Sequence, residues 1–307
     1  MVGDWLHHRY AFAIAALAAF ACGRLNFESL PEDEPTASSG SSDAAAPRDA
    51  SPESSSNGDS STNVNGRVDS AVLMGLEDAA SEFAGILQQV FPTFADDCPM
   101  SLSGIAVCEA EVLSLTTSTQ YTASAAFLPD PVTLEPTTSF HSEFRFHLAG
   151  DGGDGLAFVM QNDPDGAAAI GHWGEYLGYS GLGNSAKIDP CIAVEIDTYF
   201  NPEFDIDDNH LGVIRSSDQL SKPYAQQTVP FPITSAEPRY VWVDYDGDAQ
   251  RLRVSISETD AEPPSPLLDV SLDVYGELGG VAYFGFTAGT GEKTNVHAID
   301  SWTLEVY

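Results

Sequence analysis

Basic residues are scarce in this sequence of 307 residues, where 12 lysines and arginines stand against 46 aspartates and glutamates. The formal net charge of −34 excludes nucleic acid as a partner, because too few cations are present to neutralise phosphates. It also argues against electrostatic attraction to anionic membranes. Solubility through self-repulsion is the ordinary explanation of such a charge. Capture of divalent cations is the more specific alternative, since carboxylates are the ligands that hard cations prefer.

Cysteines are few as well, and they stand at Cys22, Cys98, Cys108 and Cys191. None of them has the CxxC spacing of a metal site. Cys98 and Cys108 are near enough in sequence to close a small loop, which would leave Cys191 free. Other pairings stay open, because connectivity does not follow from spacing alone.

No stretch is long and apolar enough to be a transmembrane helix. The apolar run Tyr10–Ala21 follows a short basic segment and has the length of the hydrophobic region of a signal peptide. It is followed by Cys22, which resembles a bacterial lipoprotein processing site, although Ala19 stands where Leu is usual. We therefore expect residues 1–22 to be an export signal that ends in a lipidated Cys22, with ordinary cleavage or a buried Cys22 as the alternatives. The chain is then anchored at a bacterial cell surface or in the periplasm, or secreted.

The next segment, residues 23–69, is rich in Ser, Ala, Pro, Asp and Gly. It has too few large apolar residues to offset the entropy cost of ordering, so we expect a disordered tether. Residues 70–307 then form the folded domain. Apolar residues in 70–90 recur at roughly helical spacing, which predicts a short helix, with a loop and an early strand as the alternative.

Beyond Phe91 the apolar residues take the period of two that is typical of strands. Even spacing occurs at Phe140, Phe144, Phe146 and Leu148 and again at Leu252, Val254 and Ile256. The turn residues Asp246-Gly247-Asp248 predict a hairpin over Tyr240–Ser257. Many short strands punctuated by Gly, Pro and Asp predict an all-β sandwich or barrel. We expect Trp242 and Trp302 to lie in its core.

The segment from Ile192 to His210 concentrates groups that bind metals. Alternating Ile and Val residues from Ile192 to Ile196 are expected to face a core, which places Glu195 and Asp197 on the opposite face. Two carboxylates on one face repel each other unless a cation compensates. The loop that follows adds carboxylates, an amide and the His210 imidazole. Oxygen ligands suit calcium and a histidine suits manganese, while an acidic loop in solvent is the alternative.

This segment resembles the metal loop of the legume-type (L-type) lectins, which has the pattern V-E-x-D-T-[YF]-x-N followed by Asp and His. The matching residues are Glu195, Asp197, Asn201, Asp205 and His210. The resemblance implies Mn²⁺, or another transition-metal ion, on the set Glu195, Asp197, Asp205 and His210. It implies Ca²⁺ on the set Asp197, the Tyr199 carbonyl, Asn201 and Asp205. Asp197 and Asp205 would bridge the two ions, and Asp207 competes with Asp205 for that position.

Further motifs of the same family follow in order. Gly153–Val159 matches the D-G-x-A-F strand, whose Asp, here Asp154, accepts hydrogen bonds from two sugar hydroxyls and usually follows a non-proline cis peptide bond. Gly171–Gly178 matches the glycine-rich loop, where Glu175 takes the position of the backbone donor to the sugar. Phe284–Gly291 matches the last loop, where Glu292 and Lys293 would contact the sugar.

The resemblance covers about Phe91 to Tyr307 and implies a concanavalin A-like jelly-roll β-sandwich of two large antiparallel sheets. It implies a metal-dependent lectin without catalysis, whose partners are glycans. Tyr199 is the expected ring for stacking on the sugar, with Phe200 or Trp173 as alternatives. A homo-oligomer stays open. The enzyme rival is a glycoside hydrolase on the same fold, which needs a second Glu shortly after Asp197. A metal-stabilised adhesion or structural domain without sugar binding is the third reading.

Overall fold

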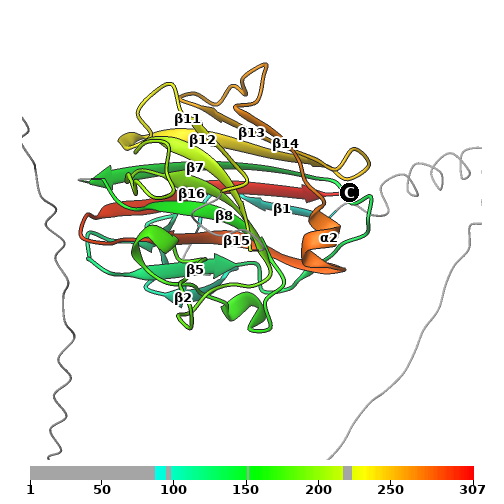
Figure 1. Cartoon of the computed structure of the whole chain (residues 1–307), viewed down its shortest axis with the longest axis horizontal. Coiled ribbons are helices and arrows are strands. Elements are labelled where there is room, and N and C mark those ends of the chain that lie inside the picture. The colour runs from blue at the N-terminus through cyan, green and yellow to red at the C-terminus, as the bar shows by residue number, and fades with distance from the viewer. Residues whose placement is uncertain (1–86, 95–97, 151, 217–222) are drawn as a thin grey trace, which may run out of the picture. The chain divides into compact units, whose positions relative to one another are not determined.

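Two antiparallel β-sheets account for nearly all the regular structure in the computed structural model of this protein (Figure 1). The structure describes residues 87–307 except 95–97, 151 and 217–222, and all of these described residues belong to one compact unit. The expected export signal with Cys22 and the expected linker 23–69 lie outside the described residues.

The first sheet, called sheet A, has eight strands. Seven of them follow one another in the order β14 (Leu268–Ser271), β13 (Arg251–Ser257), β12 (Ser235–Asp246), β7 (Phe140–Gly150), β16 (Asn295–Val306), β4 (Val112–Thr116) and β3 (Val107–Glu109). The eighth, β1 (Leu87–Phe91), pairs with the end of β16. The predicted hairpin is confirmed, because β12 and β13 pair from Tyr240 opposite Ser257 to Asp246 opposite Arg251.

The second sheet, called sheet B, also has eight strands and carries the site described below. Its order is β11 (Ala225–Thr228), β10 (His210–Arg215), β9 (Cys191–Asp197), β8 (Gly155–Gln161), β15 (Val281–Gly289), β5 (Ala123–Phe127) and β2 (Ser101–Gly104). A short strand, β6 (Val132–Thr133), pairs with the start of β15. All pairs in both sheets are antiparallel, as expected for this class.

An aromatic cluster fills the space between the two sheets. Phe144 and Trp302 from sheet A contact Phe286 from sheet B, each with ring centroids 5.0 Å apart. Edge-to-face contacts of this kind are favourable because the positive edge of one ring meets the negative face of the other. The indole N–H of Trp302 donates to Ser142 Oγ at 2.9 Å, so its polar atom is satisfied inside the core. The predicted burial of Trp302 and of Trp242 is confirmed.

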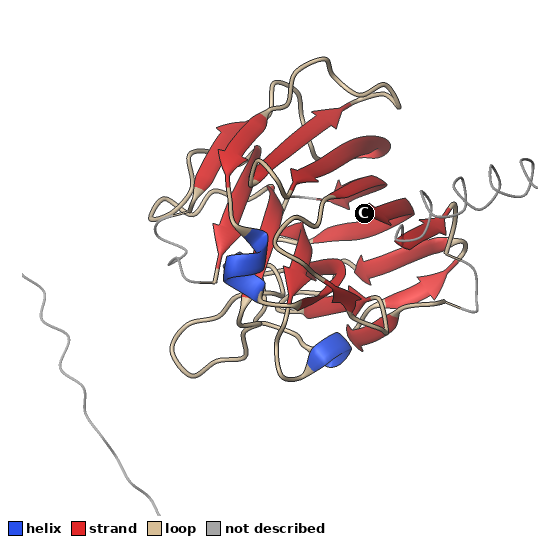
Figure 2. Cartoon of the chain, turned by 90° about the vertical axis from the view of Figure 1, so that its right-hand side faces the viewer, coloured by secondary structure: helices blue, strands red, loops and turns tan. Residues whose placement is uncertain are grey.

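Helices are short and few among the described residues (Figure 2). They are η1 (Gly166–Ala168), η2 (Gly174–Tyr176) and α2 (Val274–Leu278). No helix in this part of the chain has the length and apolar character to cross a membrane. The helix predicted over 70–90 is wrong at its end, because Leu87–Phe91 forms strand β1. Pairing with β16 supplies backbone hydrogen bonds that a local helical pattern does not reveal.

A disulfide links Cys98 to Cys108, which are 10 positions apart in sequence, and Cys191 is free and buried. This pairing is one of those that spacing left open. The bridge ties the segment before β2 to β3, and thereby one edge of sheet B to one edge of sheet A.

Candidate metal and ligand site

Strand β9 places its side chains as alternation predicts. Ile192, Val194 and Ile196 point into the core between the sheets, and Glu195 and Asp197 point to the other face of sheet B. In register, Asp197 lies opposite His210 of β10 on one side and opposite Gly155 of β8 on the other. Register partners in a sheet share a face. Long-range pairing therefore brings His210 beside Asp197, although the two are 13 positions apart in sequence.

Glycine makes room for the second acidic side chain of β9. Gly212 lies opposite Glu195 in the register, and a Cβ atom at Gly212 would come within 2.7 Å of Glu195 Oε2. A larger residue at Gly212 would push this carboxylate away. The other oxygen, Oε1, accepts a hydrogen bond from the Tyr179 hydroxyl. Glu195 is thus fixed in direction from two sides.

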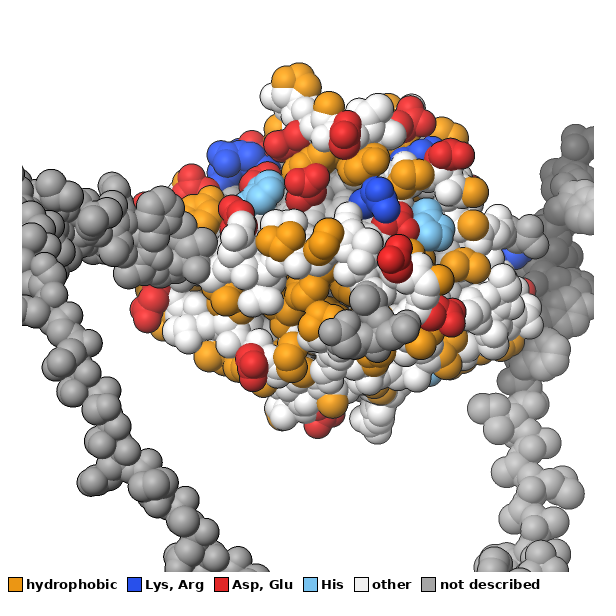
Figure 3. Space-filling model, turned by 180° about the vertical axis from the view of Figure 1, so that it is seen from behind, with side chains coloured by type: hydrophobic (Ala, Val, Ile, Leu, Met, Phe, Trp, Pro, Cys, Tyr) orange, Lys and Arg blue, Asp and Glu red, His pale blue; other side chains and the backbone are white. Residues whose placement is uncertain are grey.

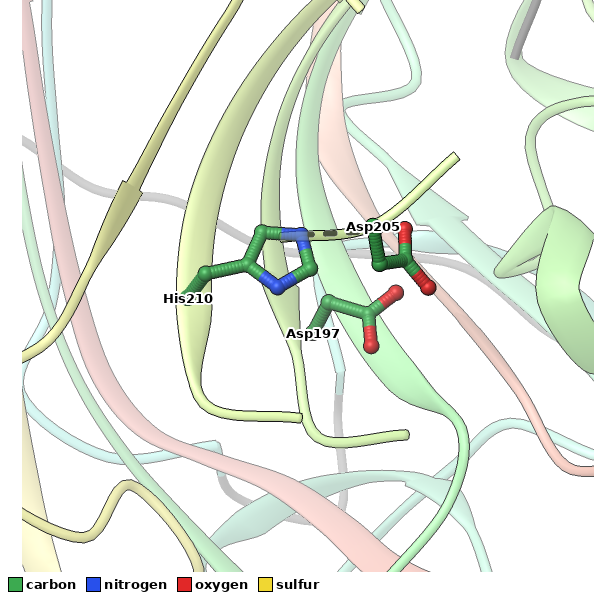
Figure 4. A group of neighbouring side chains, drawn as sticks. All are labelled: Asp197, Asp205 and His210. Carbon is green, nitrogen blue, oxygen red and sulfur yellow. Dashed lines mark ion pairs between the residues drawn. The ribbon is translucent and has the colours of Figure 1, made fainter. Parts of the chain in front are cut away.

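Three side chains converge at the end of β9 (Figure 4). Asp197, Asp205 and His210 each offer one ligand atom, and these atoms all lie within 4.8 Å of one another. His210 Nε2 lies 3.9 Å from Asp205 Oδ1, and both side chains are nearly or fully buried. Two carboxylates and an imidazole at this spacing match the donor types of a manganese-like ion.

The proton of the His210 ring is assigned by its neighbours. Nδ1 lies 2.9 Å from the backbone carbonyl of Asp207, and because a carbonyl only accepts, Nδ1 carries the hydrogen. The lone pair of a neutral ring is then on Nε2, which faces Asp205. Burial lowers the pKa of His210, and the Asp207 carbonyl opposes this only in part. A neutral imidazole oriented by a carbonyl is the form that ligates metals.

The structure separates Asp205 from Asp207. Asp205 Oδ2 accepts from the Asn201 backbone N–H at 2.6 Å, and this carboxylate belongs to the three-residue cluster. The Asp207 carboxylate accepts instead from the Asn209 backbone N–H and from the Thr228 hydroxyl. The Asp207 carboxylate lies 3.8 Å from His210 Nδ1, on the other side of the ring from Asp205, which lies 3.9 Å from Nε2.

The site carboxylates repel one another and are desolvated. Burial raises the pKa of Glu195 to about 7 and that of Asp205 to about 6. The pKa of Asp197 is raised well above its ordinary value by burial first, and then by the charges of Asp205 and Glu195. Burying an unpaired carboxylate is costly, and several carboxylates on one side of a strand also repel one another. A bound cation would offset both costs.

Asp154 stands just before β8, on the same side of the sheet. The peptide bond between Gly153 and Asp154 is cis, which agrees with the expectation for this motif. The Asp154 backbone bonds to Gly289 and Thr198, so that three strand ends meet there. Its Oδ2 is buried and accepts no hydrogen bond from the described residues. Burial raises the pKa of Asp154 to about 7, although the Gly291 backbone amide opposes the shift.

Asn201 and Tyr199 occupy the loop after β9. Asn201 Oδ1 is buried and, among the described residues, has no hydrogen-bond partner. The Tyr199 backbone N–H donates to Asp197 Oδ1 at 2.8 Å, which links this loop to the cluster of Asp197, Asp205 and His210. Tyr199 is half-buried, whereas Phe200 is 46% exposed. Buried acceptors without donors are rare in folded proteins, so Asn201 Oδ1 and Asp154 Oδ2 point to ligands from outside the chain.

The remaining predicted residues surround Asp154. Glu175 lies in η2 and acts electrostatically on both Asp154 and Asp205. The loop between β15 and β16 passes directly over Asp154, because a Cβ atom at Gly291 would lie 2.9 Å from Asp154 Oδ2. Lys293 in that loop lies against Gly153, and Lys293 and Glu292 are both exposed. All ten predicted site residues therefore lie around one end of sheet B.

Gln226 is a site residue that the sequence did not reveal. It lies on β11, opposite Gly212 of β10, and its Nε2 is 3.3 Å from His210 Nε2. It also donates a hydrogen bond to Asp205, which lowers the pKa of that carboxyl. Tyr179 was missed in the same way. Neither residue carries a local signal, because both reach the cluster only through folding.

The two large antiparallel sheets, with acidic residues and a histidine gathered at one end of sheet B, have the architecture of the concanavalin A-like β-sandwiches. The legume lectin domain model matches residues 87–307. This chain belongs to the legume lectin domain family.

Curated relatives include plant receptor kinases with L-type lectin domains. "Probable L-type lectin-domain containing receptor kinase S.7" of Arabidopsis thaliana is 32% identical over 182 residues, which is 55% of this chain and 26% of the relative. "L-type lectin-domain containing receptor kinase V.9" of the same plant is 30% identical over 227 residues, which is 66% of this chain and 33% of the relative. The matches span a quarter to a third of these relatives.

Solved structures agree on the fold. Lectin I-B4 from Griffonia simplicifolia in its metal-free form is 28% identical, with a TM-score of 0.61 over 72% of this chain and 99% of that one. The lectin from Bauhinia forficata in complex with GalNAc has a TM-score of 0.62 over 73% and 99% of the two chains, at 23% identity. The predicted all-β sandwich of two large antiparallel sheets is confirmed.

Proposed function

We propose that this domain binds carbohydrate at the Asp154 end of sheet B and that Ca²⁺ and a transition-metal ion such as Mn²⁺ organise the site. The observation that carries the proposal is the pair of buried acceptors Asp154 Oδ2 and Asn201 Oδ1, which lack donors among the described residues. A sugar supplies hydroxyl donors to the first. A calcium ion satisfies the second.

The residues divide by role in this proposal. Asp154 accepts from two vicinal hydroxyls through charge-assisted bonds. The Asn201 amide and the Glu175 backbone donate, Tyr199 offers a ring face to the C–H side of the sugar, and Glu292 and Lys293 contact it from the last loop. Glu195, Asp197, Asp205 and His210 hold the transition-metal ion. Asp197, the Tyr199 carbonyl, Asn201 and Asp205 hold calcium. The ions neutralise the acidic cluster and fix the loop that carries Asn201.

A glycan array probed with and without EDTA tests this function. Purified domain with added Ca²⁺ and Mn²⁺ is expected to bind a subset of immobilised glycans, and chelation is expected to remove that binding. Restoring the ions after EDTA controls for unfolding. Binding that is unchanged in EDTA would contradict the metal role, and an array without any metal-dependent signal would contradict the lectin function.

The glycoside hydrolase rival has a specific prediction of its own. Retaining hydrolysis needs two carboxyl groups about 5 Å apart that flank the scissile bond. Here Tyr199 and Phe200 follow Asp197 where a second Glu is required. We expect no release of reducing sugar from polysaccharides. Release that disappears in Glu195→Gln would favour the enzyme. The kinase activity named for the curated relatives is a property of those proteins.

We further propose that the chain is exported and tethered. The support is the sequence alone, namely the apolar run Tyr10–Ala21 before Cys22 and the polar segment 23–69. Individual sugar sites are shallow and wet and bind weakly, so many copies on one surface would supply avidity. Incorporation of labelled palmitate into the wild type in a bacterial host, and its loss in Cys22→Ser, tests the lipid anchor.

A further inference from the structure

Two exposed aromatic rings meet beside the proposed sugar site. Tyr121 and Trp173, together called the aromatic corner, contact each other with centroids 5.0 Å apart and planes at 72°. They remain 48% and 41% exposed. Because the rings meet at an angle, they form a corner and leave ring surface open to solvent. Exposed aromatic rings that cluster together indicate a binding surface more often than isolated ones do.

The backbone of the aromatic corner is held to the last loop. The Tyr121 N–H donates to the Gly291 carbonyl at 3.3 Å, and the Gln120 side chain donates to the Glu292 carbonyl at 2.7 Å. Tyr121 has a φ of 55°, a conformation that residues with a side chain rarely adopt. Tertiary hydrogen bonds, and not local preference, therefore set the backbone conformation from which this ring projects.

The same loop joins the aromatic corner to Asp154. Gly291, whose carbonyl binds Tyr121, packs against the Asp154 carboxylate. On the other side, Gly174 follows Trp173 and donates its N–H to the Thr290 carbonyl at 3.2 Å. Both ring residues are thus held to the loop that packs on Asp154, the residue that would accept hydrogen bonds from the sugar hydroxyls. A group attached to a sugar at Asp154 and extending over the last loop would reach them.

We propose that the aromatic corner is a second sugar subsite, which stacks the C–H face of the residue linked to the sugar held at Asp154. The ligand class is a neutral oligosaccharide. Glu175 lies two residues after Trp173, and the chain carries a formal net charge of −34, so sulfated or uronic acid units are disfavoured. This inference rests on the proposed function and extends it from a single sugar to an oligosaccharide.

Titration calorimetry with metal-loaded protein tests the subsite. The probes are the methyl glycosides of mannose, galactose and N-acetylgalactosamine, and the linked di- and trisaccharides of whichever hexose binds best. In the wild type, one oligosaccharide is expected to bind roughly five- to tenfold more tightly than its methyl glycoside, as for one aromatic stacking contact. Trp173→Ala and Tyr121→Ala should each remove most of this gain and leave the methyl glycoside affinity unchanged.

Matched controls separate the outcomes. Tyr275→Ala removes another half-exposed ring, in α2 before the start of β15, whereas the site lies at the end of that strand. It should change neither affinity. Trp173→Phe keeps a ring and should retain part of the gain.

If methyl glycosides bind but oligosaccharides gain nothing, or if Trp173→Ala keeps the gain, the subsite is wrong and the lectin function stands. If no sugar binds to metal-loaded wild type, both fail together. If Trp173→Ala instead changes only the oligomeric state in sedimentation, the corner is a protein contact and the subsite is overturned.

Discussion

Two groups of acidic side chains, one on each sheet, differ in the side chains that surround them. On the outer face of sheet A, Asp244 lies 2.7 Å from His141 and Asp300 lies 3.0 Å from His147. At the end of sheet B, the charges that raise the pKa of Asp197 come from other carboxylates. Seen from behind, the molecule carries His, acidic and basic side chains next to one another (Figure 3).

The side chains whose pKa values are raised differ between the two groups. On sheet A, hydrogen bonds to Asp244 and Asp300 raise the pKa of His141 and of His147. On sheet B, burial raises the pKa values of the carboxyls themselves. The first group is compensated within the chain, so it needs no ligand. In the second group no basic side chain is among the causes of the raised pKa values, which is more typical of a binding site than of a structural ion pair.

The largest difference between the groups is expected in glycan binding. Asp154→Ala removes two charge-assisted hydrogen bonds to the sugar and should weaken binding by about 3 kcal/mol or more, over 100-fold. Asp244→Ala on sheet A should leave glycan affinity unchanged. Calorimetry on both variants, with melting temperatures as a check of folding, measures this. Wild-type affinity in Asp154→Ala would show that the sugar site lies elsewhere.

The next effect is a pH dependence of stability that metal reverses. The pKa of Asp154 rises from 3.8 to about 7 in the fold, and that of Glu195 from 4.5 to about 7. Carboxyls with raised pKa values stabilise the fold fully below about pH 4, and this contribution is lost as pH rises towards 7. The metal-free protein should therefore become less stable from pH 4 to 7, by about 1.4 kcal/mol per pH unit for each proton released.

With Ca²⁺ and Mn²⁺ present the trend should invert, because protons compete with the ions for the same oxygens. Denaturant unfolding of the EDTA-treated and the metal-loaded protein at several pH values measures both curves. Parallel curves would mean that the buried carboxyls do not hold the ions.

A smaller effect is expected at Gln226. Removing the amide beside His210 and Asp205 in Gln226→Ala should weaken Mn²⁺ binding about tenfold, the lower range for residues that orient metal ligands. Electron paramagnetic resonance of bound Mn²⁺ reports this independently of sugar. Gln227→Ala, the neighbour on the same strand whose side chain points away, is the matched control. Equal Mn²⁺ affinity in both variants would exclude a role for Gln226.

The smallest effect belongs to sheet A. His141→Ala should cost less than about 1 kcal/mol, because the pair with Asp244 is partly exposed and screened by solvent. Since the pKa of His141 is raised in the fold, its contribution is present below about pH 6.5 and fades as the pH rises above that. The loss of stability in His141→Ala should be smaller in high salt and should not change with EDTA. Sensitivity to metal at His141 would remove the distinction between the two groups.

Much of the fold was predictable because strands repeat every two residues. Phe140 to Leu148 and Leu252 to Ile256 alternate, and the structure buries them as expected. The end of the 70–90 segment was mispredicted, because Leu87–Phe91 takes its hydrogen bonds from β16, more than 200 positions along the chain. Within the site, Glu195 and Asp197 were predictable from one strand, whereas Tyr179 and Gln226 were not, since other strands and loops deliver them.

Three features follow from the sequence alone: the acidic composition, the alternation that turns Glu195 and Asp197 away from the core, and the order of motifs that resembles the lectins. These are local properties, set by side-chain chemistry and by the two-residue repeat of a strand. Folding decides that the Asp205 carboxylate lies on the Nε2 side of the His210 ring and Asp207 on the Nδ1 side, and that Tyr121 meets Trp173 next to the loop that packs on Asp154. Loop direction and sheet register depend on hydrogen bonds between distant segments, and no local pattern records those bonds.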